Sequence, residues 1–204
     1  MSNIVVDTYE PDYMAQMLSS FMQTLRQNLE PQGLCDYFWF AVDSHSITME
    51  RKTWLDLVNN LPRLEKQLRT ATNHADEVAL IIEGLAMPLV GGEIAIYQEG
   101  KSQKYLRQVK ISGLQYASIM AFVWQIKRVA NITTYWTPTV QGTVWTLRTF
   151  VEKSQRMESE SNLLQHYTRT RQIKWQSNPM IETVMALKDA EGYVVGEKKA
   201  AELV

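Results

Sequence analysis

The chain has 204 residues, 45% hydrophobic and 21% charged, and a formal net charge of −1 at pH 7, which is typical of a soluble globular protein with one core and a small appendage. A single cysteine excludes an internal disulfide, and with only three histidines beside it argues against a structural zinc site. Because no stretch approaches the ~20 apolar residues of a membrane span and the N-terminus lacks a signal-peptide pattern, we expect an intracellular protein, cytoplasmic or nuclear, with no membrane partner.

The first part of the chain predicts the element order strand, helix, hairpin, helix, strand. Residues 4–11 contain a short apolar strand that ends in acids. Residues 34–40 form an aromatic strand with an acid at its start, and it should pair as a hairpin with a strand over residues 46–49. Apolar residues at helical spacing predict a helix over 54–72, and the apolar run 79–84 predicts a strand covered on both faces.

The triplet Glu50-Arg51-Lys52 follows the second hairpin strand, and Asp56 comes four residues after Lys52. On a strand, side chains two residues apart share a face, so Glu50 and Lys52 should point into one site and Arg51 away from it. A hard divalent cation takes carboxylate ligands, and a nearby lysine can orient water or stabilise a phosphate. Such a triplet alone is more often a solvated patch, so its sequence context decides between the two interpretations.

Five short motifs follow one another along the first half of the chain. They are Val6-Asp7-Thr8-Tyr9-Glu10-Pro11, Asp36, Glu50-Arg51-Lys52-x-x-x-Asp56, Arg63-Leu64-Glu65-Lys66-Gln67 and Leu80-Ile81-Ile82-Glu83-Gly84. This series resembles the nuclease domain of the XPF, Mus and Hef-type structure-specific endonucleases. The resemblance covers residues 4–84 well and implies a restriction-endonuclease-like α/β core with a mixed central sheet flanked by helices.

The resemblance also implies roles for individual residues. Asp36 and Glu50 would hold Mg²⁺ or Mn²⁺, with Asp7 as a further ligand and Asp56 in support. Lys52 would position water or stabilise the phosphate.

The resemblance also implies roles for three residues that do not bind the metal. Arg51 would contact the substrate or pair with an acid inside the fold. Arg63 and Gln67 would contact DNA.

Some positions depart from the family pattern. Cys35 replaces the glycine before Asp36, Tyr9 replaces an arginine, and Pro62 replaces the glycine before the Arg-Leu-x-x-Gln motif. The spacer between Asp36 and the triplet is long, which leaves Asp43 as a rival ligand. We expect Asp36 to be the ligand and Asp43 to lie at the hairpin tip.

The second half continues the α/β alternation. A strand is expected over residues 93–97, a helix over 114–129, a strand over 132–136 and a helix after Pro138. The basic series Lys101, Lys104, Arg107 and Lys110 recurs every three residues and predicts a basic stripe on a helix, which either contacts phosphates or is a solvated face.

The composition changes near residue 154. We therefore expect a nuclease domain over 1–154, a linker or exposed helix over 155–180, and a small helical hairpin over 181–204. The last segment resembles part of a helix-hairpin-helix motif, with Val194 in place of its first glycine. In that interpretation Gly196, Lys198 and Lys199 hold a DNA phosphate. The alternative is a plain helical cap.

The favoured function is a metal-dependent DNA endonuclease that cuts near branched, flap or fork junctions. The alternative is a non-catalytic DNA-binding or scaffold subunit, although this chain keeps the acids and the lysine that inactive members typically lose. A nuclease of the same fold that acts on unbranched DNA or RNA is a third interpretation. The resemblance also implies a homodimer or heterodimer formed through the nuclease domain.

Overall fold

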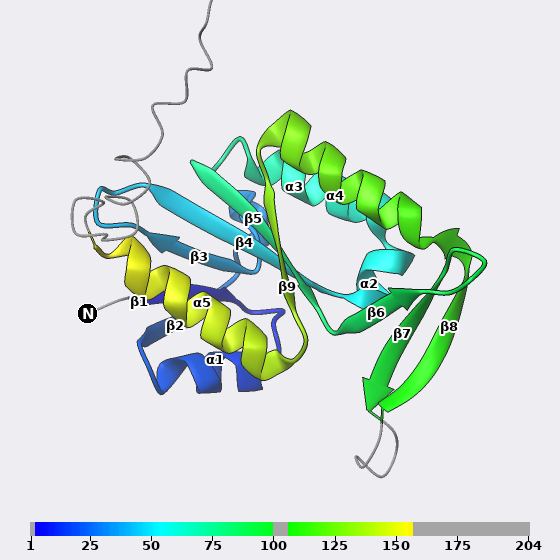
Figure 1. The fold of residues 1–204 in the computed structure, drawn as a ribbon. Coiled ribbons are helices and arrows are strands. Elements are labelled where there is room, and N and C mark those ends of the chain that lie inside the picture. The colour runs from blue at the N-terminus through cyan, green and yellow to red at the C-terminus, as the bar shows by residue number, and fades with distance from the viewer. Residues whose placement is uncertain (1–2, 100–105, 157–204) are drawn as a thin grey trace, which may run out of the picture. The chain divides into compact units, whose positions relative to one another are not determined.

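A six-stranded mixed sheet organises the described part of the chain, which is residues 3–99 and 106–156 of a computed structural model (Figure 1). These residues belong to the unit Met1–Met157. In spatial order the strands are β2 (Gln23–Gln27), β1 (Asn3–Asp7), β3 (Tyr37–Phe40), β4 (Ser46–Thr53), β5 (Glu77–Glu83) and β9 (Thr133–Thr137). β3 runs antiparallel to both of its neighbours, and the other pairs are parallel. The expected mixed sheet and α/β class are confirmed.

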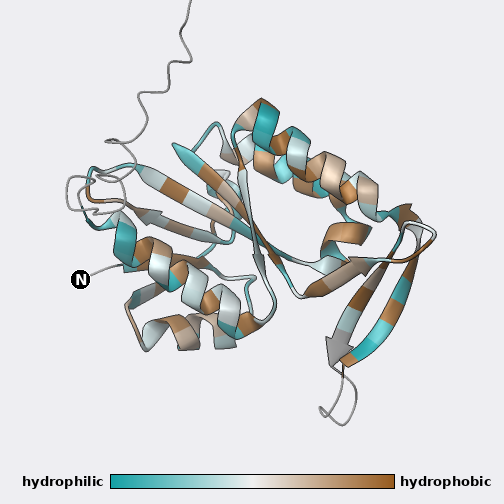
Figure 2. Ribbon diagram, in the orientation of Figure 1, coloured by the Kyte–Doolittle hydropathy of each residue, from teal (hydrophilic) through white to brown (hydrophobic). Residues whose placement is uncertain are grey.

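Helices cover the sheet on both faces. One face packs against α1 (Asp12–Ser19) and α5 (Val140–Ser154), and on the other face the core includes α2 (Trp54–Asn59), α3 (Leu61–Ala71) and α4 (Tyr116–Ala130). β5 contributes to both cores because its buried side chains alternate between the faces, as the apolar run predicted. Figure 2 shows hydrophobic and hydrophilic residues together on α3 and α4, which is the pattern of helices buried on one side.

The prediction of a single helix over residues 54–72 is wrong in one respect, because the structure has two helices there. Thr53 caps α2, with its hydroxyl accepting the Asp56 N–H at 3.2 Å. Asn60, at φ −133°, separates α2 from α3, and Pro62 lies in the first turn of α3. Proline has no N–H for a helix interior but is tolerated in a first turn, so the chain starts a new helix there.

A second sheet follows the central one, formed by β6 (Leu85–Pro88), β7 (Glu93–Glu99) and β8 (Leu106–Gln115), all antiparallel. The helix expected for the basic series is therefore wrong at Arg107 and Lys110, which lie on β8. Its backbone pairs with β7, and Val109 and Ile111 pack against the core. Lys101 and Lys104 lie outside the described residues.

Two features complete the described fold. A 3₁₀ turn, η1 (Glu30–Gln32), lies between β2 and β3. No helix within residues 3–99 and 106–156 is long and apolar enough to cross a membrane. The expected segments beyond residue 156, with Gly196, Lys198 and Lys199, lie outside the described residues.

Candidate active site

Strand β4 separates the triplet as its alternation predicted. Glu50 and Lys52 point to the face toward α3, whereas the side chain of Arg51 points to the opposite face. Ile47 and Met49, on the same face as Arg51, belong to the core under α1 and α5. The strand therefore delivers one acid and one lysine to a single site.

Asp36, Glu50 and Lys52 converge on one point. The ammonium of Lys52 hydrogen-bonds to Glu50 Oε1 and lies 4.0 Å from Asp36 Oδ2. Asp36 Oδ2 also accepts the backbone N–H of Arg51 at 2.8 Å, so the hairpin itself fixes this carboxylate beside β4. Glu50 is only 1% exposed. Two carboxylates and one ammonium thus share a small, largely buried volume.

Electrostatics in this cluster follow from burial and from the two like charges. Burial, and then the neighbouring Glu50 carboxylate, raise the pKa of Asp36 well above its usual value. Burial alone would lower the pKa of Lys52, but the attraction of Glu50 and Asp36 outweighs it and raises that pKa. Lys52 is therefore a cation at neutral pH, and additional positive charge would stabilise the ionised form of Asp36.

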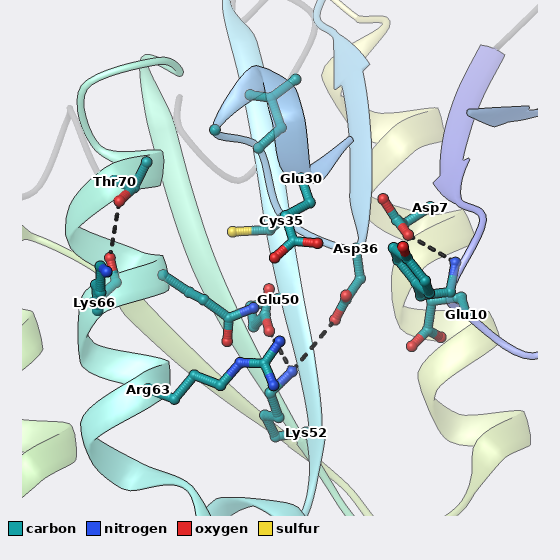
Figure 3. A pocket seen from close by; sticks show the side chains of 14 residues that line it. Asp7, Glu10, Glu30, Cys35, Asp36, Glu50, Lys52, Arg63, Lys66 and Thr70 are labelled. Atoms are coloured by element: carbon teal, nitrogen blue, oxygen red, sulfur yellow. Dashed lines mark hydrogen bonds and ion pairs between the residues drawn. The ribbon is translucent and has the colours of Figure 1, made fainter. Parts of the chain in front are cut away.

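The opposite wall of the site is helix α3 (Figure 3). Arg63, Lys66, Gln67 and Thr70 recur on one side of this helix and line a cavity of about 710 Å³ together with Asp36, Glu50 and Lys52. The side-chain oxygen of Gln67 is buried and has no hydrogen-bond partner among the described residues. The wall therefore presents two cations, Arg63 and Lys66, to a molecule bound in the cavity.

Asp7 also lines the cavity, but its carboxylate is already engaged. Oδ1 accepts the N–H of Tyr9 at 2.7 Å, and Oδ2 accepts the N–H of Leu29 at 2.6 Å. Its own N–H donates to the carbonyl of Asp36 at 2.7 Å. These contacts make Asp7 the residue that fixes the loop after β1 against the start of the hairpin, next to the expected ligand.

Arg51 does not line the cavity, and its side chain lies among buried acids on the other face of β4. Its guanidinium donates to both Glu83 oxygens, from Nε to Oε2 at 3.0 Å and from Nη2 to Oε1 at 2.7 Å. Nη1 lies 3.3 Å from Glu10 Oε2. Thr143, on α5, donates to Glu83 at 2.6 Å. Of the two roles expected for Arg51, the structure supports pairing with acids inside the fold.

Asp56 and Asp43 also lie away from the cavity. Asp56 is exposed on the first turn of α2, where its Oδ2 accepts the hydroxyl of the N-cap residue Thr53 at 2.7 Å, so its contacts are those that fix the start of the helix. Asp43 lies in the turn between β3 and β4, and its Oδ1 accepts the N–H of His45 at 3.0 Å. Of the two rival acids, Asp36 is the one beside Glu50 and Lys52.

Some of the residues expected to bind substrate line the cavity, and others lie elsewhere. Arg63 and Gln67 line the cavity as expected for substrate contacts. Arg107 is exposed on β8, in the second sheet, and does not line the cavity. Arg107 and Lys110 are three residues apart, which on a strand places their side chains on opposite faces, so they form no continuous stripe. Lys66 also lines the cavity and was not among the expected site residues, although its position three residues after Arg63 on a helix places both on one side.

The donor set fits a hard divalent cation with few protein ligands. No group of three or more possible metal-ligating side chains forms within residues 3–99 and 106–156. Mg²⁺ usually keeps several waters and binds through one or two carboxylates plus substrate phosphates. Asp36 and Glu50 supply two carboxylates that are held together by Lys52, so the residues present suit that mode of binding.

A mixed sheet between helices, with two carboxylates and a lysine at a hairpin, defines a restriction-endonuclease-like nuclease domain. Residues 6–150 match the family model of the ERCC4 domain, so the chain belongs to the ERCC4 domain family, whose members are generally nucleases, and its domain is of the XPF type. No curated protein sequence matches the chain.

Two solved structures have a similar fold. XPF from Aeropyrum pernix is 23% identical, with a TM-score of 0.53, and the match covers 98% of this chain and 95% of that one. XPF from Aeropyrum pernix in complex with DNA is 20% identical, with a TM-score of 0.50, and the match covers 100% of this chain and 80% of that one. At these identities the likeness is one of fold.

Proposed function

We propose that this protein is a divalent-metal-dependent DNA endonuclease that cuts phosphodiester bonds near branched, flap or fork junctions. The observation that carries the proposal is the convergence of Asp36, Glu50 and Lys52 in a cavity whose opposite wall carries Arg63 and Lys66. Membership of the ERCC4 domain family supports nuclease chemistry. The DNA complex of the similar XPF structure supports DNA as the substrate class.

Each residue of the site has a role in this proposal. Asp36 and Glu50 would hold Mg²⁺ or Mn²⁺, which when bound supplies positive charge at the phosphate and lowers the pKa of water. Lys52 keeps its proton and hydrogen-bonds to the scissile phosphate or to the attacking water. Arg63 and Lys66 bind the phosphates of the strand across the cavity.

One hydrogen bond and the burial of one carboxylate support this arrangement. The Arg51 N–H holds the Asp36 carboxylate in place at 2.8 Å, so the backbone of the triplet orients the acid beside it. Burial of Glu50 excludes bulk water from the carboxylate, which strengthens its attraction for a cation. Dimer formation through the nuclease domain remains a prediction from the family resemblance.

The test is a cleavage assay of the purified chain on flap, fork and linear DNAs with Mg²⁺, with Mn²⁺ and with a chelator. Glu50→Gln and Lys52→Ala should each lower the cleavage rate by on the order of a hundredfold or more, since each removes an oriented electrostatic partner. Glu65→Gln and Lys127→Ala are matched controls, because both side chains lie outside the cavity. Both controls should cut like the parent.

The outcomes separate the enzyme from its alternative. Equal cleavage by the parent and both site variants under Mg²⁺ would show that the catalytic assignment is wrong. Tight binding of branched DNA without cleavage under either cation would instead favour the non-catalytic subunit. Equal cleavage of linear and branched DNAs would support the nuclease activity but contradict the proposed selectivity for branched structures.

A further inference from the structure

The sheet face that carries Asp36 continues beyond the candidate active site as an apolar surface. Asp36 directly precedes β3, and on β3 the side chains of Phe38 and Phe40 point to this face, while Tyr37 and Trp39 are buried under α1 and α5. The strand register extends the surface sideways, because Phe38 pairs with Val5 of β1. Val5 pairs in turn with Leu25 of β2, so one row crosses three strands. We call Leu25, Val5, Phe38 and Phe40 the aromatic platform.

No described helix covers the aromatic platform. The core that includes α2, α3 and α4 contains no side chain from β1, β2 or β3, and the opposite core contains none of the four platform residues. Phe40 is 57% exposed and Leu25 is 52% exposed. Large exposed apolar side chains that are contiguous on one face commonly mark a binding surface.

The geometry of the two phenylalanines leaves a ring face available. Their ring centroids are 5.0 Å apart with an interplanar angle of 82°, so the contact is edge to face. A cavity of about 380 Å³ adjoins both rings, and its lining also includes Asn3, Val42 and Gln155. An apolar floor with a few polar side chains at its rim is typical of a site for a flat, partly polar ligand.

Two basic residues lie close in the chain to Gln155, which lines this cavity. Gln155 donates from Nε2 to the carbonyl of Phe40 at 2.7 Å, which ties the end of α5 to β3. Lys153 comes two residues before Gln155 in the chain and Arg156 directly after it. Both are exposed, and neither forms an ion pair within the described part of the chain. An aromatic surface with cations beside it has the two features by which proteins bind single-stranded nucleic acids.

We propose that the aromatic platform binds an unpaired nucleotide, with its base stacked on Phe40 and its phosphate near Lys153 and Arg156. Asp36 lies directly before β3, and at the rise of an extended chain Phe38 and Phe40 are about 7 and 14 Å along the chain from it. One nucleic-acid strand can therefore continue from the platform to the cavity. A base inside a duplex has both faces covered by its neighbours, whereas an unpaired base has a face free for Phe40. The platform thus deepens the proposed function, on which it rests, by assigning a subsite that selects single-stranded character beside the cut.

The experiment measures binding without cleavage, in a chelator, by fluorescence anisotropy of labelled strands with the full chain. Phe40→Ala should weaken binding of a single-stranded oligothymidylate by about five- to a hundredfold, and Phe40→Trp should retain it. Binding of an abasic strand of the same length should be equal for the parent and Phe40→Ala. Trp124→Ala is the matched control, since Trp124 is an exposed aromatic residue on α4, outside the platform.

Several results would overturn the proposal. They are unchanged oligothymidylate binding by Phe40→Ala at an unchanged melting temperature, an equal loss of binding for Trp124→Ala, and an equal loss on the abasic strand. Dissociation of an oligomer in Phe40→Ala, with no change in nucleic-acid binding, would assign the platform to a second copy of the chain. This binding test can fail separately from the cleavage assay. A protein without nuclease activity can still bind through the platform, and an active nuclease can bind DNA without using it.

Discussion

Replacing Arg51 by methionine tests the buried ion-pair network most directly. Arg51 is 8% exposed and is the cation between two buried carboxylates, Glu10 at 9% and Glu83 at 6%. Methionine keeps most of the apolar length of the side chain but removes the charge and all donors. Both carboxylates then remain buried without their ion-pair partner.

The magnitude follows from burial of unpaired charge. Removing one partner of a buried ion pair costs about 3–5 kcal/mol in the free energy of unfolding. For a chain of this length 1 kcal/mol shifts the melting temperature by about 2–4 °C, so Arg51→Met should melt roughly 6–20 °C lower. The matched control is Arg69→Met, because the Arg69–Glu65 pair is exposed and should contribute less than about 1 kcal/mol.

The loss of unfolding free energy in Arg51→Met should also depend on pH. Burial raises the pKa of Glu10 in the folded protein, and the charge of Arg51 opposes that increase. A raised folded-state pKa in an acid means that stability falls as pH rises from the unfolded-state pKa to the folded-state pKa. Without Arg51 the pKa of Glu10 rises further, so the penalty is largest at neutral pH and shrinks on acidification.

The assay is urea unfolding of the parent, Arg51→Met and Arg69→Met at about pH 7.5 and about pH 5. The stability difference between the parent and Arg51→Met should be smaller at the lower pH. Adding Glu83→Gln to Arg51→Met should recover part of the loss, since it removes one of the two buried charges. Equal stability of Arg51→Met and the parent at neutral pH, or a difference that grows on acidification, would refute the reasoning.

Three further predictions concern the expected ligands and the end of the chain. Asp36→Asn should lower the calorimetric affinity for Mn²⁺ while Asp43→Asn leaves it unchanged, and the reverse order would transfer the ligand role to Asp43. Asp56→Ala should cut DNA at the parental rate and lose about 1 kcal/mol or less of stability, since its side chain contacts only the N-cap residue Thr53 of α2 among the described residues; a hundredfold slower rate would identify it as a catalytic residue. Deleting residues 181–204 should weaken DNA affinity without lowering the melting temperature if this segment holds a phosphate, whereas a lower melting temperature at unchanged affinity would identify a structural cap.

The sequence by itself determined the parts of the site that depend on local geometry. Alternation along a strand places Glu50 and Lys52 on one face and Arg51 on the other, whatever packs around them. The hairpin brings Asp36 to the level of Glu50, since Tyr37 pairs with Met49. The apolar run of β5 likewise predicted a strand covered on both faces.

Tertiary structure decided what depends on partners distant in the chain. Arg51 meets Glu83 across 32 residues and Glu10 across 41, and no local pattern specifies which acids share a buried cation. β2 has a polar sequence and exposed side chains, so its strand character comes from backbone pairing with β1 rather than from hydrophobic alternation. β8 is a strand for the same reason. The spacing of its basic side chains suggested a helix, but pairing with β7 satisfies the hydrogen-bonding groups of its backbone.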